Sequence, residues 1–420
     1  MNPRQLLLDS FHAAVAAADP ARILPAHLPK PPRGRTLVVG GGKAAASMAA
    51  AVEAHWPVHA PLSGLVVTRY QHGLPTRRIE VVEASHPLPD GRGEAAALRM
   101  LDMSNQLGPD DLLLVLISGG GSSLLAAPVD GVTLKELRHV TKSLLHSGAA
   151  IADINAVRKH LTRASGGRLA QAADGARILA LIISDVIGDN PTHIASGPCA
   201  PDPTTYQDAL DCLARCRIDA PESIRQYLLR GVSGGIEDTP KPGDACFAHV
   251  ENRVIGNAHI CLEAAAACFA QHGIQTIILS EQVSGDTYDV AQTHAALVRS
   301  ISTDHRLALI SGGETTVNVR YPDGRGGRNS AYLLALAISL GDAKPVWALA
   351  CDTDGIDGSE DNAGATISPD TLERAQTLGL DATKALLFNN SYGFFAALGD
   401  LVITGPTRTN VNDYRVMLIN

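Results

Sequence analysis

Three segments of the chain combine a short apolar run with glycines and polar residues. They span residues 37–43, 115–123 and 309–316. Each apolar run has the length of a buried parallel strand, and the glycines let the backbone turn sharply where the strand ends. Glycines also let backbone N–H groups approach an anion closely. Three such strand exits predict a site for a ligand with several negative charges, and phosphates are the first candidate.

The first exit ends in Lys43 but is not a Walker A loop, because Ala44 follows the lysine where that motif requires Ser or Thr. A weaker dinucleotide fingerprint, G-x-G-x-x-A, runs from Gly40 to Ala45. The next predicted strand ends at Arg69 rather than at an acidic residue, which disfavours NAD but suits the 2′-phosphate of NADP. An NADP-dependent oxidoreductase is therefore the alternative to a phosphate-transferring enzyme.

The second exit, Ser118–Ser123, places three consecutive glycines between hydroxyl side chains. Its backbone N–H groups form a natural cradle for phosphates. Ser122 and Ser123 could contact a phosphate or simply cap the next helix. A cap explains Ser123 but leaves the three glycines unexplained, so this exit is the strongest candidate for a phosphate site.

Charged side chains elsewhere suggest further parts of a site. Asp185 follows the predicted strand 178–183, where it could act as a general base or hold Mg²⁺. The acidic loop 352–361 could bind Mg²⁺ or a ribose, or be a solvated turn. The basic segment 155–168 could surround a nucleotide with positive charge, or be a solvated helix face. Arg328 stands beside glycines and could bind a carboxylate or a phosphate.

The elements that must position these residues alternate between strand and helix, which predicts βαβ units and a mostly parallel sheet. A helix is expected over 4–24. Strands are expected at 36–39, 64–68, 79–83, 111–117 and 178–183. The stretch 230–250 is rich in glycine and proline and predicts a domain boundary. A second α/β pattern follows, with strands at 253–256, 276–280, 307–310, 345–351, 401–404 and 416–419, and with 317–320 pairing with 307–310 as a hairpin.

Composition narrows the class of protein. The chain has 420 residues, 45% of them hydrophobic and 19% charged, and its net charge is −8. This balance argues against nucleic acid as a partner, because a phosphate backbone requires a basic surface. The spacing of the seven cysteines is not that of a disulfide framework, so the thiols are expected to be reduced. No apolar stretch is long enough to span a membrane and no signal peptide is visible, so a cytoplasmic enzyme is expected.

The ordered set of motifs resembles one family, the MOFRL-type or class II glycerate 2-kinases, along essentially the whole chain. The motifs are 39–44, 118–123, 157–161, 184–189, 195–205, 312–316, 326–329, 353–358 and 404–407. The resemblance implies an α/β protein with a Rossmann-like N-terminal domain at 1–245, a smaller MOFRL domain at 250–420 and an active site in the cleft between them. It implies phosphorylation of glycerate at the 2-hydroxyl with ATP and Mg²⁺.

The resemblance also implies roles for particular residues. The central polar groups are Lys43, Asp185 and Arg328, and the roles of Lys43 and Arg328 could be exchanged. Asp185 and Asp354 are the expected metal ligands. Substrate contacts are expected from Arg158, Lys159 and Asn410. Nucleotide contacts are expected from Gly41, Gly42, Ser118, Gly119, Gly120, Gly121, Ser122, Gly312, Gly313 and Glu314.

One departure from the family pattern stands directly after Arg328. The family usually continues Gly-Gly-Arg-Asn with glutamine and glutamate, whereas here Ser330 and Ala331 follow. The substrate could therefore be a related small hydroxy acid. Members of the family have also carried the name hydroxypyruvate reductase, which keeps the oxidoreductase alternative open. A non-catalytic nucleotide sensor is a third class, and the resemblance allows a homodimer.

Overall fold

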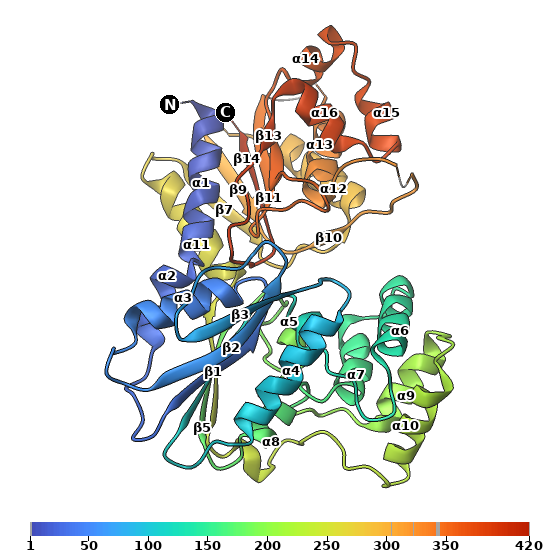
Figure 1. The fold of residues 1–420 in the computed structure, drawn as a ribbon. Coiled ribbons are helices and arrows are strands. Elements are labelled where there is room, and N and C mark those ends of the chain that lie inside the picture. The colour runs from blue at the N-terminus through green and yellow to red at the C-terminus, as the bar shows by residue number, and fades with distance from the viewer. Residues whose placement is uncertain (1, 304, 322, 342–344, 420) are drawn as a thin grey trace. The chain divides into compact units, whose positions relative to one another are not determined.

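The computed structural model describes residues 2–303, 305–321, 323–341 and 345–419. The chain forms two compact units, each shown by its elements in Figure 1. The N-terminal unit is Pro20–Ile255, and the C-terminal unit combines Met1–Asp19 with Gly256–Asn420.

The N-terminal unit is built on a six-stranded sheet in the order β3-β2-β1-β4-β5-β6. The neighbours from β3 to β5 all pair in parallel. This is the strand order of doubly wound α/β folds, and the expected mostly parallel sheet is confirmed. The strands are β1 (Thr36–Gly41), β2 (Leu62–Arg69), β3 (Ile79–Ala84), β4 (Leu112–Ile117), β5 (Arg177–Ile183) and β6 (Val250–Gly256).

The central strands β1 and β4 are buried along their whole length. Such continuous burial is expected of parallel strands covered on both faces, and here α3 and α4 pack against the sheet. The helices are α2 (Pro20–Ile23), α3 (Ala45–His55), α4 (Gly91–Ser104), α5 (Gly121–Leu124), α6 (Leu134–His146), α7 (Ile151–Leu161), α8 (Arg168–Ala172), α9 (Tyr206–Arg215) and α10 (Glu222–Val232). Short 3₁₀ turns are η1 (Leu24–His27), η2 (Ile194–Ser196) and η3 (Ala245–Phe247).

The C-terminal unit has a mixed six-stranded sheet in the order β13-β12-β11-β14-β9-β7. Only β7 and β9 pair in parallel among these strands, and the other neighbours are antiparallel. The strands are β7 (Gln275–Ser280), β9 (Leu307–Ser311), β11 (Val346–Asp352), β12 (Gly364–Ile367), β13 (Leu401–Val402) and β14 (Asp413–Ile419). A separate two-stranded ribbon pairs β8 (Gly285–Asp286) with β10 (Thr315–Thr316).

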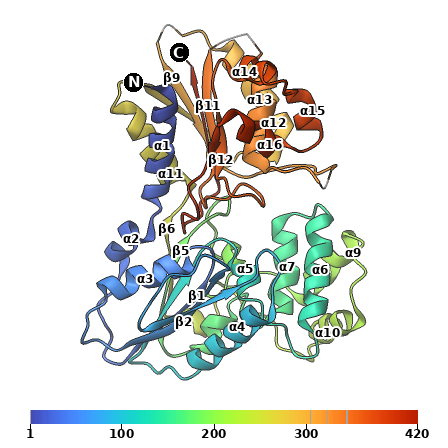
Figure 2. The ribbon, with the colours of Figure 1, turned by 45° about the horizontal axis from the view of Figure 1, so that its top comes forward.

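Helices cover both faces of this second sheet (Figure 2). Helices α1 and α11 contact each other and the sheet, and α12 and α13 pack together with α13 against β11 and β12. The helices are α1 (Pro3–Ala17), α11 (Ala258–Ala270), α12 (Thr287–Ser300), α13 (Arg328–Leu340), α14 (Thr371–Thr377), α15 (Ala382–Leu387) and α16 (Ser391–Leu398). Among the described helices, none combines the length and the apolar character needed to cross a membrane.

The two units differ from the predicted domains in two places, at the first 19 residues and at the boundary near residue 255. Helix α1 belongs to the C-terminal unit rather than to 1–245, because its apolar face packs there. The Phe11 and Tyr414 rings lie 6.1 Å apart, and the Tyr414 hydroxyl donates to the Ser10 hydroxyl at 2.9 Å. Strand β6 completes the first sheet rather than opening the second pattern.

The predicted hairpin strand at 317–320 is wrong, since these residues form a loop. The strand is shorter and lies earlier, at β10, where it pairs with β8. In the main sheet β9 pairs instead with β7 and with β14, which comes from the far end of the chain. A partner so distant in sequence leaves no local signal.

Candidate functional site

Three neighbouring strands of the N-terminal unit end at the same edge of its sheet. Lys43 follows β1, the Ser118–Ser123 turn follows β4, and Asp185 follows β5. Because these strands are parallel and adjacent, their carboxyl ends bring the three segments together. The chain continues outward from β1 to β2 on one side and reaches β4 on the other, which makes this edge a topological switch point. Open α/β sheets bind their ligands at such points.

The turns after β1 and β4 are interlocked. The Lys43 N–H donates to the Gly119 carbonyl at 2.8 Å, and the Ala44 N–H donates to the Ser118 hydroxyl at 2.9 Å. A Cβ atom added to Gly42 would lie 2.1 Å from the Ser118 hydroxyl, so only glycine fits there. The glycines of the dinucleotide fingerprint are thus used to pack two turns against each other.

The Ser118–Ser123 turn keeps two backbone donors available. Among the described residues, none accepts a hydrogen bond from the N–H of Gly119 or Gly120. Gly120 has a φ of +83°, which glycine adopts without strain. A Cβ on Gly120 would lie 3.6 Å from Lys43 Cγ, so the lysine stem runs along this turn. The following helix α5 has only four residues, so the two donors rather than a helix dipole make this turn a candidate anion site.

The loop at η2 supports the same turn. Ala195 and Ser196 both have positive φ values, 50° and 58°, which cost energy in residues other than glycine. The Ser196 hydroxyl lies 2.9 Å from the Ser122 hydroxyl and 3.2 Å from the Asn155 side-chain oxygen. Neither Ser196 nor Asn155 was predicted as a site residue, although both lie in or beside the motifs named above. Small polar side chains at these positions were the feature of the sequence that could have indicated their role.

Arg158 stands on α7, one turn after Asn155, and lines a small recess with Ser122, Ser123 and Thr162. Burial lowers the pKa of the Arg158 guanidinium to about 10. No described carboxylate forms an ion pair with it. A half-buried cation without a protein counter-ion is suited to an anionic ligand.

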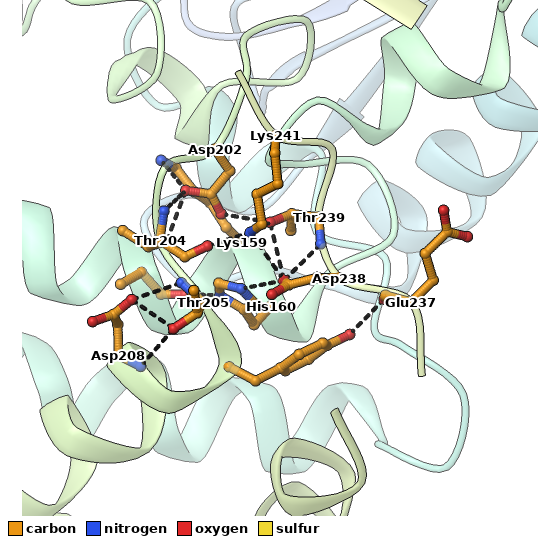
Figure 3. Close-up of polar contacts among 12 residues, drawn as sticks. Lys159, His160, Asp202, Thr204, Thr205, Asp208, Glu237, Asp238, Thr239 and Lys241 are labelled. Carbon is orange, nitrogen blue, oxygen red and sulfur yellow. Dashed lines mark hydrogen bonds and ion pairs between the residues drawn. The ribbon is translucent and has the colours of Figure 1, made fainter. Parts of the chain in front are cut away.

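Lys159, by contrast, is fully engaged within the protein (Figure 3). Its side chain is 1% exposed, and its ammonium lies 3.2 Å from the Asp202 carboxylate and 2.8 Å from the Thr192 hydroxyl. The same Asp202 carboxylate accepts from the Thr204 N–H at 3.0 Å and from the Thr239 hydroxyl at 3.0 Å. The predicted substrate contact by Lys159 is not supported, because the ammonium already holds the loop before α9 to α7.

The C-terminal unit gathers its charges around Arg328, the first residue of α13. The guanidinium contacts the Asp413 carboxylate at 2.9 Å, Asp352 at 2.7 Å and Glu314 at 2.8 Å. Burial acts to lower the pKa of Arg328, but the three carboxylates outweigh it and hold the pKa well above its usual value. Asp413 and Asp352 are buried, whereas the Glu314 side chain is 54% exposed.

The two aspartates explain why an arginine is needed here. Asp352 and Asp413 are direct partners in the antiparallel register of β11 and β14. Like charges directly opposite each other destabilise a sheet. Arg328 contacts both carboxylates, and Arg415 donates to Asp413 at 2.5 Å. Arg328 is therefore part of the framework of this unit, a role that sequence spacing did not reveal.

The third glycine-rich exit is less open than predicted. The Gly312 N–H donates to the Ser280 carbonyl at 2.9 Å, and the Gly313 carbonyl accepts from the Asp413 N–H at 3.2 Å. A Cβ on Gly313 would lie 2.3 Å from the Val283 backbone. Packing thus accounts for both glycines, and Glu314 is an exposed charged group of this exit.

Two further predicted residues lie in the framework of the acidic loop. Asp354 is buried and its carboxylate accepts from the Ile356 N–H at 2.8 Å. Asn410 is buried and its side-chain oxygen accepts from the Asn412 N–H at 3.4 Å. Both contacts stabilise loops, which does not favour a direct contact of either residue with metal or substrate. Among the described residues, no group of three or more His, Cys, Asp or Glu side chains is arranged for a metal ion.

The structural role of Asp357 was not predicted from the sequence. Its buried carboxylate accepts from the Asn329 N–H at 2.9 Å and from the Ser330 N–H at 2.8 Å, which caps α13. The Ser330 hydroxyl donates to the same carboxylate at 2.7 Å. Ser330 therefore completes this cap, while Ala331 lines a pocket beside Arg328.

Comparisons with known proteins agree with this architecture. Residues 6–229 match the model of a domain of unknown function, DUF4147, and residues 307–413 match the MOFRL family. A protein of Thermotoga maritima named D-glycerate 2-kinase is 36% identical over 99% of this chain and 98% of its own length. The chain belongs to the MOFRL-type glycerate kinase family.

Members of this glycerate kinase family carry more than one name. An Agrobacterium vitis protein named "Putative hydroxypyruvate reductase" is 48% identical over 100% of this chain and 95% of its own length. The crystal structure of glycerate kinase from Thermotoga maritima superimposes with a TM-score of 0.86 at 35% identity, covering 99% of both chains. The predicted family and the α/β class are thereby confirmed.

Proposed function

We propose that this protein is an ATP-dependent kinase that phosphorylates the 2-hydroxyl of D-glycerate, giving 2-phosphoglycerate and ADP. One observation carries the proposal: Lys43 runs beside two glycine N–H groups that no described residue accepts. This pairing of a cation with free donors lies at the ligand-binding edge of a doubly wound sheet. The relationship to a D-glycerate 2-kinase over nearly the whole chain supplies the substrate class.

To catalyse phosphoryl transfer, a protein must mainly position the reacting groups and stabilise the charge on the phosphates. The N–H groups of Gly119 and Gly120 hold phosphate oxygens, and the Lys43 ammonium neutralises charge on the transferred group. Gly41, Gly42, Gly121 and Ser118 shape the two interlocked turns, and Ser122 orders the second one through Ser196. The donors are held before the ligand arrives, so little reorganisation is required.

The acceptor acid is held by Arg158, whose unpaired guanidinium suits the glycerate carboxylate. Asp185, half-buried after β5, receives the proton of the 2-hydroxyl. The same carboxylate suits Mg²⁺, since that ion commonly uses one or two carboxylates together with phosphate oxygens. When bound, the ion would neutralise charge on the nucleotide phosphates. Asp354 fits this role poorly because its carboxylate is committed to its own loop.

Arg328 contributes through its exposed side. Its contacts with Asp352 and Asp413 are buried and fixed, whereas its contact with Glu314 is open to water. An anionic group of a ligand can take the place of Glu314 on the guanidinium without disturbing the framework. Gly312 and Gly313 place Glu314 for this exchange.

The decisive experiment measures ADP release with D-glycerate, L-glycerate, hydroxypyruvate and tartrate, and identifies the phosphorylated carbon of the product. We expect turnover with D-glycerate and a product carrying phosphate on carbon 2. The matching control offers hydroxypyruvate with NADPH, because a 48% identical relative carries a reductase name. Steady oxidation of NADPH at a comparable rate would replace the kinase proposal, and ATP binding without turnover would favour a sensor.

A further inference from the structure

The loop between β3 and α4, residues 85–90, takes part in none of the roles assigned above. The strand before it belongs to the parallel part of the sheet of the N-terminal unit, since β3 pairs in parallel with β2 and β2 with β1. The loop therefore leaves the sheet at the same edge as Lys43 and the Ser118–Ser123 turn. Open α/β sheets bind their ligands at this edge, so the loop is placed to form a further wall of the phosphate site.

The imidazole ring of His86 lies directly against Gly120. A Cβ atom added to Gly120 would be 2.9 Å from both Nε2 and Cδ2 of His86, so the ring occupies the space beside the glycine. The same Cβ would be 3.6 Å from Lys43 Cγ. The Nε2 edge of the ring and the stem of the lysine therefore both border a glycine whose N–H group no described residue accepts.

The rest of the loop packs against the same turn. Pro89 lines the small recess that also contains Ser122 and Arg158. Where α4 begins, a Cβ on Gly93 would lie 2.9 Å from the Leu124 carbonyl, which belongs to α5. The loop and the start of α4 are thus held to the turn at more than one point.

The Asp90 carboxylate fixes the loop from within. Its Oδ1 accepts from the N–H groups of Arg92 and Gly93 at 3.1 and 3.0 Å, which caps α4. Its Oδ2 accepts from the Ser85 N–H at 3.1 Å and from the Tyr70 hydroxyl at 2.7 Å. Both ends of the loop are therefore tied together before a ligand binds, which reduces the entropic cost of binding.

His86 has the chemistry that a phosphate contact requires. Among residues 85–90 it is the one whose side chain can carry a positive charge, and its ring N–H can donate a hydrogen bond. The residue is half-buried, so water competes less for this donor than at an exposed site. A hydrogen bond to a charged phosphate oxygen is stronger than one between neutral groups.

We propose that His86 donates a hydrogen bond from Nε2 to a phosphate oxygen held at the Gly119–Gly120 turn. The proposal deepens the proposed kinase function and rests on it for the identity of the nucleotide. Lys43 supplies a point charge on a flexible stem. The short, rigid imidazole instead fixes the direction of one phosphate oxygen. All of these groups belong to the N-terminal unit.

The test replaces His86 with Leu, which keeps much of the volume of the ring but cannot donate a hydrogen bond. We expect the Kd for inorganic tripolyphosphate, measured by titration calorimetry, to rise roughly 10- to 100-fold. The KM for ATP should also rise, while the KM for glycerate stays within about twofold of wild type. His86→Gln, whose amide can still donate, should recover part of the loss. His59→Leu, at an exposed position of the same unit, should match wild type.

A spectroscopic measurement separates a contact from a merely structural role. In protein with isotope-labelled histidine, the Nε2 resonance of His86 is identified by its absence in H86Q. This resonance should shift when tripolyphosphate is added to wild type, and the resonance of His59 should stay in place. The measurement also decides the matter if H86L does not fold.

Two results would overturn the proposal and leave the kinase function standing: a folded H86L that binds tripolyphosphate as tightly as wild type, or a His86 resonance that does not move at saturation. Failure of wild type to bind tripolyphosphate overturns it as well. Absence of ATP turnover in wild type is a separate failure of the proposed function, and the tripolyphosphate measurements then still decide the His86 contact.

Discussion

At the scale of single residues, two cations of the N-terminal unit differ in what surrounds them. Arg158 has no ion-pair partner among the described residues, whereas Lys159, the next residue, is enclosed by Asp202 and Thr192. Adjacent helical positions point in different directions, which explains the contrast. Of these two neighbouring residues, Arg158 is therefore the one available to an anionic ligand.

Replacing Lys43 by Ala tests the charge at the phosphate cradle. We expect kcat to fall about 100- to 1,000-fold, as when one stabilising donor is removed from an active site. The melting temperature should stay close to wild type, since the residue is not in a hydrophobic core. Lys30→Ala, at an exposed position of the same unit, serves as the control. A K43A enzyme with wild-type turnover would contradict the assignment.

Replacing Arg158 by Gln tests the carboxylate contact. Loss of a charged hydrogen bond costs about 1.5–3 kcal/mol, so the KM for glycerate should rise roughly 10- to 100-fold. The KM for ATP should change little. Arg138→Gln, on the exposed face of α6, should leave both constants unchanged. Steady-state kinetics with each substrate varied in turn decides the point, and an effect confined to ATP would refute the role.

At the scale of elements, the segment 236–244 is fastened to α7 by a polar cluster (Figure 3). The Asp238 carboxylate lies 2.9 Å from His160 Nε2 and 3.1 Å from the Lys241 ammonium, and it accepts from the Thr239 N–H at 2.7 Å. Burial alone raises the pKa of Asp238. The hydrogen bonds and positive charges outweigh burial, so the pKa lies well below its usual value.

This shift predicts an acid-sensitive contribution to stability. In the unfolded chain the Asp238 carboxylate has a pKa of about 4. It therefore binds a proton at a higher pH in the unfolded chain than in the folded protein. Its contribution is therefore complete above about pH 4 and is lost as the pH falls further. We expect Asp238→Asn to flatten the fall of the unfolding free energy between about pH 5 and pH 2. Urea titrations at stepped pH measure this, and D130N, at a fully exposed carboxylate, should keep the wild-type slope.

At the scale of the whole molecule, the chain has separate hydrophobic clusters in its two units. The first 19 residues are grouped with the last 165 although the N-terminal unit lies between them in sequence. Phe11 on α1 is fully buried, and its ring neighbour is Tyr414 on β14. The C-terminal unit therefore depends on both ends of the chain.

Phe11→Ala tests this grouping. Removing a buried phenylalanine ring costs about 3–5 kcal/mol. We expect hydrogen exchange to accelerate in α11 and β14 while the amides of β1 and β4 keep their protection. Val52→Ala on α3, buried in the N-terminal unit, should show the opposite pattern. Equal acceleration of β1 and β4 in F11A would contradict the division.

The sequence by itself determined the family, the alternation of strands and helices, and the glycine-rich exits. These features are local: strand length, glycine and the order of motifs are visible along the chain. Lys43 and the Ser118–Ser123 turn could be recognised as a candidate anion site for the same reason. Their positions after β1 and β4 follow the predicted parallel sheet.

Only the tertiary structure decided which charges are already neutralised. Lys159, Arg328 and Asp357 find their partners 14 to 85 residues away, across strand registers and loop contacts that leave no pattern in the sequence. The value of a cation to a ligand depends on such partners, because a buried charge that is paired is no longer available. The folded protein thus separates the N–H donors of Gly119 and Gly120, which no described residue accepts, from glycines and charges that serve the framework alone.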